Sequence, residues 1–180
     1  MVLVRRSATE TVYESVMAPF TGASIVEDLR RLDSDFGFAW EVDGVGWVDI
    51  VVVAERAGIG LAGEMQTDGL AARLRTDDTT LAPLRADIVS GSVLAHNDAL
   101  VLGSMGAVDN LSVTWSDQDL LVECASGLET ELRIYGPETN DVVVGKDSVV
   151  FRQDGDYVVL SWPAEVAEDT GEPGDTSEPE

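Results

Sequence analysis

The sequence predicts an all-β protein, an antiparallel β-sandwich of many short strands, and three observations point to it. Short apolar runs with two-residue alternation, the pattern of half-buried strands, fill residues 2–162. Glycine, aspartate, asparagine or proline interrupts these runs roughly every 8 to 12 residues, the spacing typical of sandwiches. No window carries a helical stripe, so the alternation of strands and helices that builds a parallel sheet is missing.

The expected strands follow one another through the whole chain. They cover residues 2–6, 11–18, 25–32, 45–54, 60–66, 70–76, 80–88, 92–94, 99–102, 108–116, 119–125, 130–134, 142–144, 148–152 and 156–161. Turn-forming residues separate several of them, and Asp154-Gly155 is expected to join residues 149–152 and 157–160 as a hairpin.

One domain accounts for most of the 180 residues. Residues 1–163 are predicted to form the sandwich. Residues 164–180 hold seven acidic residues, no basic residue and little apolar surface. Such a segment cannot offset the entropy of ordering, so a disordered acidic tail is expected there.

The charge of the chain excludes some partners. With 34 acidic against 11 basic residues the net charge is −23, which disfavours nucleic acid as a partner. No apolar run is long enough to span a membrane, and no signal peptide is visible. Ten of the basic residues are arginine and only Lys146 is lysine, so we interpret the acidity as halophilic, that of a cytoplasmic protein in a high-salt organism. An acidic surface that binds cations or a basic partner is the alternative.

Catalytic motifs are almost absent, because the chain has one cysteine and one histidine. Cys124 is the single cysteine and lies in an apolar run, which predicts a buried, inert thiol. His96 is the single histidine and lies in a polar turn, where we expect it to be exposed. The alternative is a small hydrolase or lyase centred on His96 with Tyr13 or Tyr157. No metal site and no cofactor are expected.

Two further patterns have simple explanations. Residues 58–63 spell G-x-G-x-x-G, but a strand-like segment follows where a dinucleotide site requires a helix. We therefore interpret these glycines as bends between strands. Paired aspartates such as Asp33/Asp35, Asp77/Asp78 and Asp117/Asp119 are expected by chance in a chain with 34 acidic residues.

The four tryptophans raise the question of sugar binding. Trp40 and Trp47 flank Asp43-Gly44, a predicted turn, while Trp115 and Trp162 end strands. Packing in the core or at strand ends is the usual role of tryptophan. The alternative is a carbohydrate-binding surface that includes Trp40, Trp47 and Tyr135.

The N-terminal passages VLVRRS (residues 2–7), ETVYESVMAPF (10–20) and IVEDLRRL (25–32) resemble a segment of heparinase II/III-like polysaccharide lyases. Residues 68–74 and 81–93 are similar in style to the hairpin-rich C-terminal sheet of that family. The resemblance implies a β-sandwich that follows an α/α-toroid and a reaction that is β-elimination on uronate-containing polysaccharide. The family's catalytic residues lie before this region, so none maps onto a numbered position here.

The resemblance implies that this chain is the non-catalytic β-sandwich portion of such a lyase. We expect it to pack on a catalytic α/α-toroid domain, to shape one wall of the polysaccharide cleft and to have no activity of its own. The alternative is a stand-alone carbohydrate-binding or adhesion module.

Overall fold

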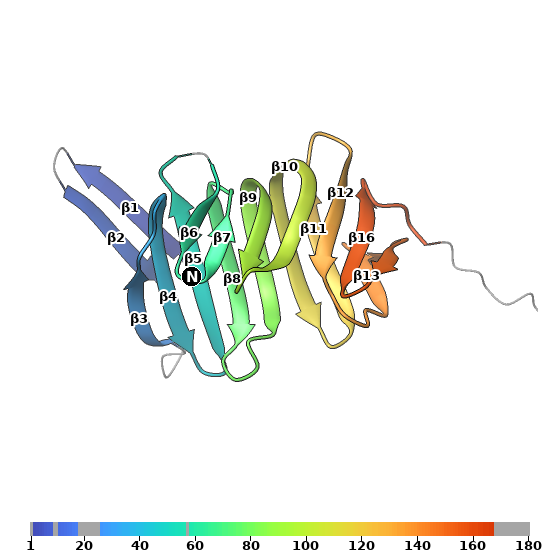
Figure 1. Cartoon of the computed structure of the whole chain (residues 1–180), viewed down its shortest axis with the longest axis horizontal. Helices are drawn as coiled ribbons and strands as arrows, with labels where there is room; N and C mark the ends of the chain where they lie inside the picture. The colour runs from blue at the N-terminus through green and yellow to red at the C-terminus, as the bar shows by residue number, and fades with distance from the viewer. Residues whose placement is uncertain (1, 9–10, 18–25, 57, 168–180) are drawn as a thin grey trace, which may run out of the picture.

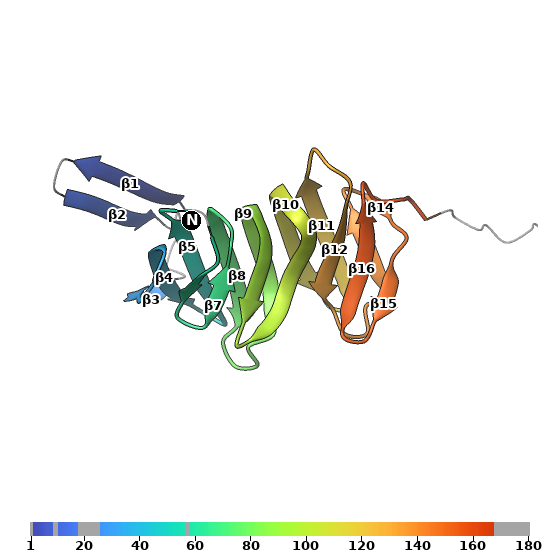
Figure 2. The ribbon, with the colours of Figure 1, turned by 45° about the horizontal axis from the view of Figure 1, so that its top comes forward.

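The predicted all-β fold is confirmed. The computed structural model describes residues 2–8, 11–17, 26–56 and 58–167, the first two ranges as backbone only. These residues form strands and turns, and no helix occurs among them. The strands lie in two layers, which Figures 1 and 2 show from two directions.

One layer is a large sheet in which neighbouring strands are hydrogen-bonded in a single path. Its strands, in spatial order, are β3 (Val26–Leu32), β4 (Gly37–Gly44), β5 (Trp47–Ala54), β8 (Ala71–Asp77), β9 (Pro83–His96), β10 (Ala99–Ser116), β11 (Asp119–Ala125), β13 (Asp141–Val144) and β14 (Asp147–Ser148). All neighbours in this sheet are antiparallel except β11 and β13, which are parallel.

The second layer is smaller and shares two strands with the first. It consists of β6 (Gly60–Ala62), β7 (Met65–Thr67), the end of β9, the start of β10, β12 (Thr130–Tyr135), β16 (Tyr157–Trp162) and β15 (Arg152–Asp154). A separate hairpin of β1 (Val2–Ala8) and β2 (Thr11–Met17) forms its own two-stranded sheet beside the large one (Figure 2).

Strands β9 and β10 are long because each runs through both layers. The first half of β9 pairs with β8, and its second half pairs with β7. Between the halves, Ser90 has a φ of 50°, and a Cβ added to Gly91 would lie 2.6 Å from the Cα of Gly69. This contact leaves no room for a side chain, so the bend requires glycine at position 91. In β10 the register shifts between Gly103 and Val108.

The core fills the space between the layers. On the large sheet it uses one face, whose residues alternate with outward-facing ones. Its largest fully buried side chains are Met65, Leu74, Ile88, Leu94, Leu102, Leu111, Leu120, Leu132, Ile134, Val52 and Val108.

Several predicted strand boundaries are wrong, and local packing explains them. Strand β4 was not predicted, because the turn lies at residues 45–46, where Gly46 has a φ of 81°, and not at Asp43-Gly44. The ring of Trp47 covers Gly44, where a Cβ would overlap it. Residues 60–66 form the β6–β7 hairpin and not one strand, because Gly63 turns the chain with a φ of 57°.

Other predicted strands are joined or interrupted in the structure. Residues 83–88 and 92–94 belong to the single strand β9, and residues 99–102 and 108–116 to β10, because bulges and bends accommodate the breaks. Residues 80–82, predicted to begin a strand, lie in the loop before β9. Conversely, the predicted strand at residues 148–152 is interrupted between β14 and β15. The predicted hairpin at Gly155 is present, with Asp154 paired to Tyr157.

Only the start of the predicted tail can be compared with the structure. Val166 forms a bridge with Val149, and the amide of Ala167 donates to the carbonyl of Ser148 at 2.9 Å. Residues 164–167 thus lie along the end of the large sheet. Residues 168–180 lie outside the described residues, and the tail stays a prediction.

Candidate functional site

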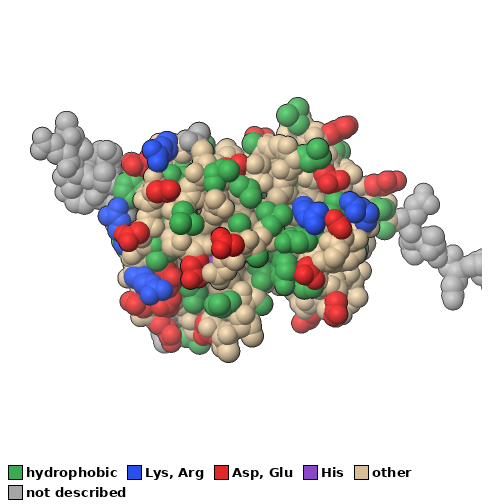
Figure 3. Space-filling model, in the orientation of Figure 1, with side chains coloured by type: hydrophobic (Ala, Val, Ile, Leu, Met, Phe, Trp, Pro, Cys, Tyr) green, Lys and Arg blue, Asp and Glu red, His purple; other side chains and the backbone are tan. Residues whose placement is uncertain are grey.

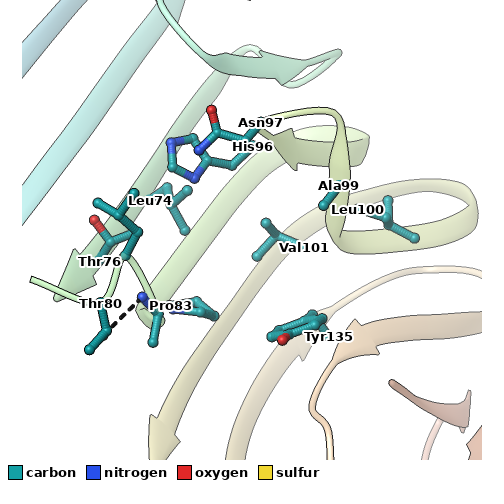
Figure 4. A pocket seen from close by; sticks show the side chains of 12 residues that line it. Leu74, Thr76, Thr80, Pro83, His96, Asn97, Ala99, Leu100, Val101 and Tyr135 are labelled. Carbon is teal, nitrogen blue, oxygen red and sulfur yellow. Dashed lines mark hydrogen bonds between the residues drawn. The ribbon is translucent and has the colours of Figure 1, made fainter. Parts of the chain in front are cut away.

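A cavity of about 320 Å³ opens at one end of the sandwich, and we call it the mouth cavity. Its walls come from the end of β8, the loop that follows, the β9–β10 turn and the end of β12 (Figure 4). They are mainly apolar, with four polar side chains at the rim other than the buried Thr76. The lining residues are Leu74, Thr76, Thr80, Leu81, Ala82, Pro83, His96, Asn97, Ala99, Leu100, Val101 and Tyr135.

His96 is not the exposed turn residue that the sequence predicts. It is the last residue of β9, paired with Met65 and Ala99, and its side chain is only 12% exposed. The turn itself consists of Asn97 and Asp98, which have φ values of 50° and 62°. Such a two-residue turn with positive φ extends the strands up to it and so carries His96 into the sheet.

The imidazole of His96 is held in its neutral form. Burial lowers its pKa below the ordinary value, and the carboxylate of Glu64, 3.9 Å from Nε2, only partly opposes this. A neutral imidazole offers one hydrogen-bond donor and one acceptor.

Tyr135 lies across the cavity from His96 (Figure 4). Its ring meets that of Tyr157 edge to face at 6.1 Å, and its carbonyl accepts a 2.7 Å hydrogen bond from the indole of Trp115. Within the described residues no hydrogen bond joins His96 to a tyrosine, and the side chain of Tyr13 lies outside them. The geometry thus offers no support for a His–Tyr catalytic pair.

A second candidate site lies on the large sheet, on the face turned away from the core. Strand register places two tryptophans, three arginines and two aspartates together there. We call it the arginine–tryptophan face, and it consists of Trp40, Trp47, Asp49, Arg73, Arg75, Arg85 and Asp87.

Asp49 anchors one half of this face. It is fully buried, and Arg75 on the neighbouring strand donates to both of its carboxylate oxygens, from Nε at 2.8 Å and from Nη2 at 2.7 Å. The guanidinium of Arg75 lies 3.9 Å from the centre of the Trp47 ring. The hydrogen bond to Asp49 raises the pKa of Arg75, against the effect of burial. The three side chains form one stacked, ion-paired unit.

Asp87 anchors the other half. It accepts hydrogen bonds from Arg73 Nε at 2.8 Å, from Arg85 Nη2 at 3.1 Å and from the hydroxyl of Ser112 at 2.7 Å. Burial raises the pKa of the carboxyl, but the bonds from Arg85 and Ser112 and the nearby arginine charges outweigh it, so the pKa lies below its usual value. Asp87 is therefore a carboxylate throughout the neutral range.

Beside these ion pairs lies a shallow apolar hollow of about 210 Å³. Its lining includes Val51, Val53, Ala71 and Val89 with Arg73 and Asp87 at its side. Trp40 pairs with Val51 and thus stands at the hollow's edge. Val51 lies four positions beyond Trp47 in β5, so the two tryptophans lie roughly 13 Å apart along the strand direction.

The three residues considered for sugar binding therefore fall in two places. Trp40 and Trp47 share one sheet face, whereas Tyr135 lies at the mouth cavity between the layers. Trp115 and Trp162 pack against the core, as expected. The ion pairs were not predicted from the sequence, although Arg73-x-Arg75 and Arg85-x-Asp87 have the two-residue spacing that places side chains on one face of a strand.

The paired aspartates, the glycine-rich stretch and Cys124 do not form a ligand-binding site among the described residues. Carboxylates are scattered over the surface that Figure 3 shows, and the described residues contain no group of three or more potential metal ligands. The G-x-G-x-x-G stretch forms the β6–β7 hairpin, as interpreted, and a Cβ on Gly60 would overlap the ring of Phe36. Cys124 is half-buried, and burial, aided by Asp109, raises its pKa to about 11.

No protein-family model matches the chain, and no curated protein matches it. In the part of the chain that the structure describes, no helix has the length and apolar character needed to cross a membrane.

Proposed function

We propose that this chain is a non-catalytic β-sandwich that binds an acidic, uronate-containing polysaccharide through the arginine–tryptophan face. The observation that carries the proposal is the grouping of three arginines and two tryptophans on one sheet face of a protein with a net charge of −23. Sugar rings stack on aromatic rings, and guanidinium groups pair with carboxylates in a forked geometry.

Trp40 supplies the stacking surface. It is partly exposed and lies beside Val51, a lining residue of the apolar hollow, where the C–H face of a sugar would rest. One face of the Trp47 ring is covered by Arg75, so Trp47 contributes chiefly by holding that arginine in place. Together they favour a flat ligand that lies along the sheet.

The arginines supply the charge. Arg85 keeps 42% of its side chain exposed while it contacts Asp87, so it can turn donors outward to a sugar carboxylate. Three arginines stand against two aspartates within this group, although Asp77, opposite Trp47, and Glu123, opposite Ser112, lie on the same side of the sheet. A uronate polymer would meet less repulsion at the arginines than at the carboxylates around them.

The resemblance to heparinase II/III-like lyases supports the hypothesis that this surface belongs to the β-sandwich portion of a lyase. As the β-sandwich portion of a lyase, the chain would pack on a catalytic α/α-toroid and form one wall of the substrate cleft. A stand-alone carbohydrate-binding module would use the same face, so the binding experiment applies to both.

Affinity electrophoresis of the full chain through gels with and without polyuronate tests the proposal. We expect retardation by polyuronate and none by an uncharged glucan. Trp40→Ala should weaken binding about tenfold, the equivalent of one lost stacking contact, and Trp40→Phe should retain most of it. Arg85→Gln should weaken binding and reduce its dependence on salt.

Arg152→Ala is the matched control, because Arg152 lies on β15 in the other layer and is 63% exposed. Equal binding by Trp40→Ala and the unmodified chain, or no binding of polyuronate at all, would refute the proposal. Appearance of unsaturated uronate product with the chain alone would contradict its non-catalytic role.

A further inference from the structure

We infer that the mouth cavity is a second binding site, which takes one small uncharged ring compound with a single hydroxyl or amide group between His96 and Tyr135. The argument rests on the size, the rigidity and the polarity of the cavity. It does not depend on the polysaccharide proposal, because the cavity lies between the layers and shares no residue with the arginine–tryptophan face.

The size of the cavity sets the size of the ligand. A closed apolar cavity of about 150 Å³ is enough for benzene, and sites for drug-sized ligands begin near 300 Å³. At about 320 Å³, the mouth cavity fits a six-membered ring with one or two substituents.

The loop at the entrance is held in a fixed conformation. The carboxylate of Asp77 accepts bonds from the amides of Thr79 and Thr80 at 3.0 and 2.7 Å and from the Thr80 hydroxyl at 2.9 Å. The amide of Asp77 donates to the carbonyl of Ala82 at 2.9 Å, and the amide of Leu81 donates to the carbonyl of Asp77 at 3.0 Å.

This network keeps Leu81 in an unfavourable conformation. Its φ of 59° lies in the left-handed region, which side-chain-bearing residues rarely adopt. Strained residues of this kind concentrate at sites where a ligand is held, because the surrounding structure must maintain them. Leu81 lines the mouth cavity and is half-exposed at its entrance.

The polarity of the walls selects an uncharged ligand. None of the described residues that line the cavity carries a fixed charge. The neutral imidazole of His96 and the phenol of Tyr135 lie on opposite sides of an apolar floor that includes Leu74 and Val101 (Figure 4). An ion would lose its hydration there without gaining a counter-charge.

The same walls disfavour a sugar. A monosaccharide carries several hydroxyl groups, and each one that is buried without a hydrogen-bond partner weakens binding. The cavity offers few polar partners, from His96, Tyr135 and Asn97 at its rim and from the buried Thr76, because the Thr80 hydroxyl already donates to Asp77. A phenol, a cyclic alcohol or an aromatic amide presents one polar group and a ring, which matches this arrangement.

Titration of the full chain with phenol, benzyl alcohol and benzamide, followed by NMR at pH 8, tests the inference. We expect saturable shifts of the His96 ring signals with all three compounds and no saturable shift with benzoate or benzylammonium. Binding of benzoate as strong as that of phenol, or no saturable shift with any of the three, would overturn it.

Variants locate the site. Ala82→Phe places a ring at the entrance on an exposed position and should abolish binding, whereas Ala125→Phe, exposed at the end of β11, should leave it unchanged. Tyr135→Phe should weaken phenol binding about threefold to tenfold, the value of one hydrogen bond, while Tyr157→Phe should not. Unchanged phenol binding by Ala82→Phe would place the ligand elsewhere and refute the inference.

Discussion

Asp49 and Arg75 face each other across β5 and β8, and the guanidinium donates to both oxygens of a carboxylate that no solvent reaches. The pair lies on the outer face of the large sheet, yet Asp49 is as buried as any core residue. The side chains around it provide this cover, with Arg75 stacked on Trp47. The burial of Asp49 therefore depends on its partner.

Removal of the partner should destabilise the fold. Arg75→Leu leaves a buried carboxylate without its counter-charge, which typically costs about 3 kcal/mol in the free energy of unfolding. Urea denaturation followed by tryptophan fluorescence measures the loss. The double variant Asp49→Leu/Arg75→Leu should recover most of the stability, because no buried charge remains. Equal stability of Arg75→Leu and the unmodified protein would show that Asp49 needs no partner.

Gly60→Ala should destabilise the β6–β7 hairpin. The added Cβ overlaps the buried ring of Phe36, which must then move within a packed core, at a cost of about 1–3 kcal/mol. Thermal denaturation gives the change in Tm. Gly106→Ala is the control, because no atom lies within 4 Å of an added Cβ there and φ is not in the left-handed region. Similar losses in both variants would contradict the packing explanation.

The free energy of unfolding should fall at acidic pH, because His96 then takes up a proton. The pKa of His96 lies below its ordinary value of 6.5 in the folded protein, whereas the unfolded chain has the ordinary value. The unfolded state therefore binds the proton first, and the free energy of unfolding decreases as the pH drops below about 6.5, levelling off below the folded pKa.

Urea titrations between about pH 8 and pH 5 measure this effect against His96→Gln, which has no titrating group at that position. The free energy of unfolding of the unmodified protein, relative to that of His96→Gln, should decrease as the pH drops below about 6.5 and should not vary above about pH 7.5. A flat difference would mean that His96 titrates equally in both states. Carboxylates distant from His96 contribute in the same way to both proteins.

Cys124 should react slowly with disulfide reagents in the folded protein. Its pKa of about 11 leaves little thiolate at pH 8, and thiolate is the reacting form. We expect a rate well below that of the chain unfolded in urea, measured with an aromatic disulfide reagent. Equal rates for the folded and unfolded protein would contradict both the burial and the raised pKa.

Most strands could be predicted from residue alternation, because a strand with one buried face has apolar residues at every second position. Residues 71–77 illustrate this, since Ala72, Leu74 and Thr76 are buried and Arg73 and Arg75 point outward. Strand ends were less predictable, because they depend on partners distant in the chain. The Trp47 ring on Gly44 and the contact of Gly91 with Gly69 are interactions of this kind.

The candidate sites were predictable only in part. The alternation places Trp40 and Trp47 on one face once strand β4 is known, but the pairing of β5, β8 and β9 that assembles the ion pairs is not local information. His96 was misplaced because a polar tetrapeptide suggests exposure, whereas the turn uses only two of those residues. The mouth cavity joins segments from residue 74 to residue 135, which only the folded chain brings together.

The sharing of β9 and β10 between the layers has a consequence for how this chain folds. A sandwich of two independent sheets can in principle separate into halves, but here separation requires both long strands to lose ladder hydrogen bonds at once. The β9–β10 hairpin closes through a turn of only two residues, so its formation costs little loop entropy and can precede the pairing of distant strands. Because this hairpin takes part in both layers, we expect it to form early in folding.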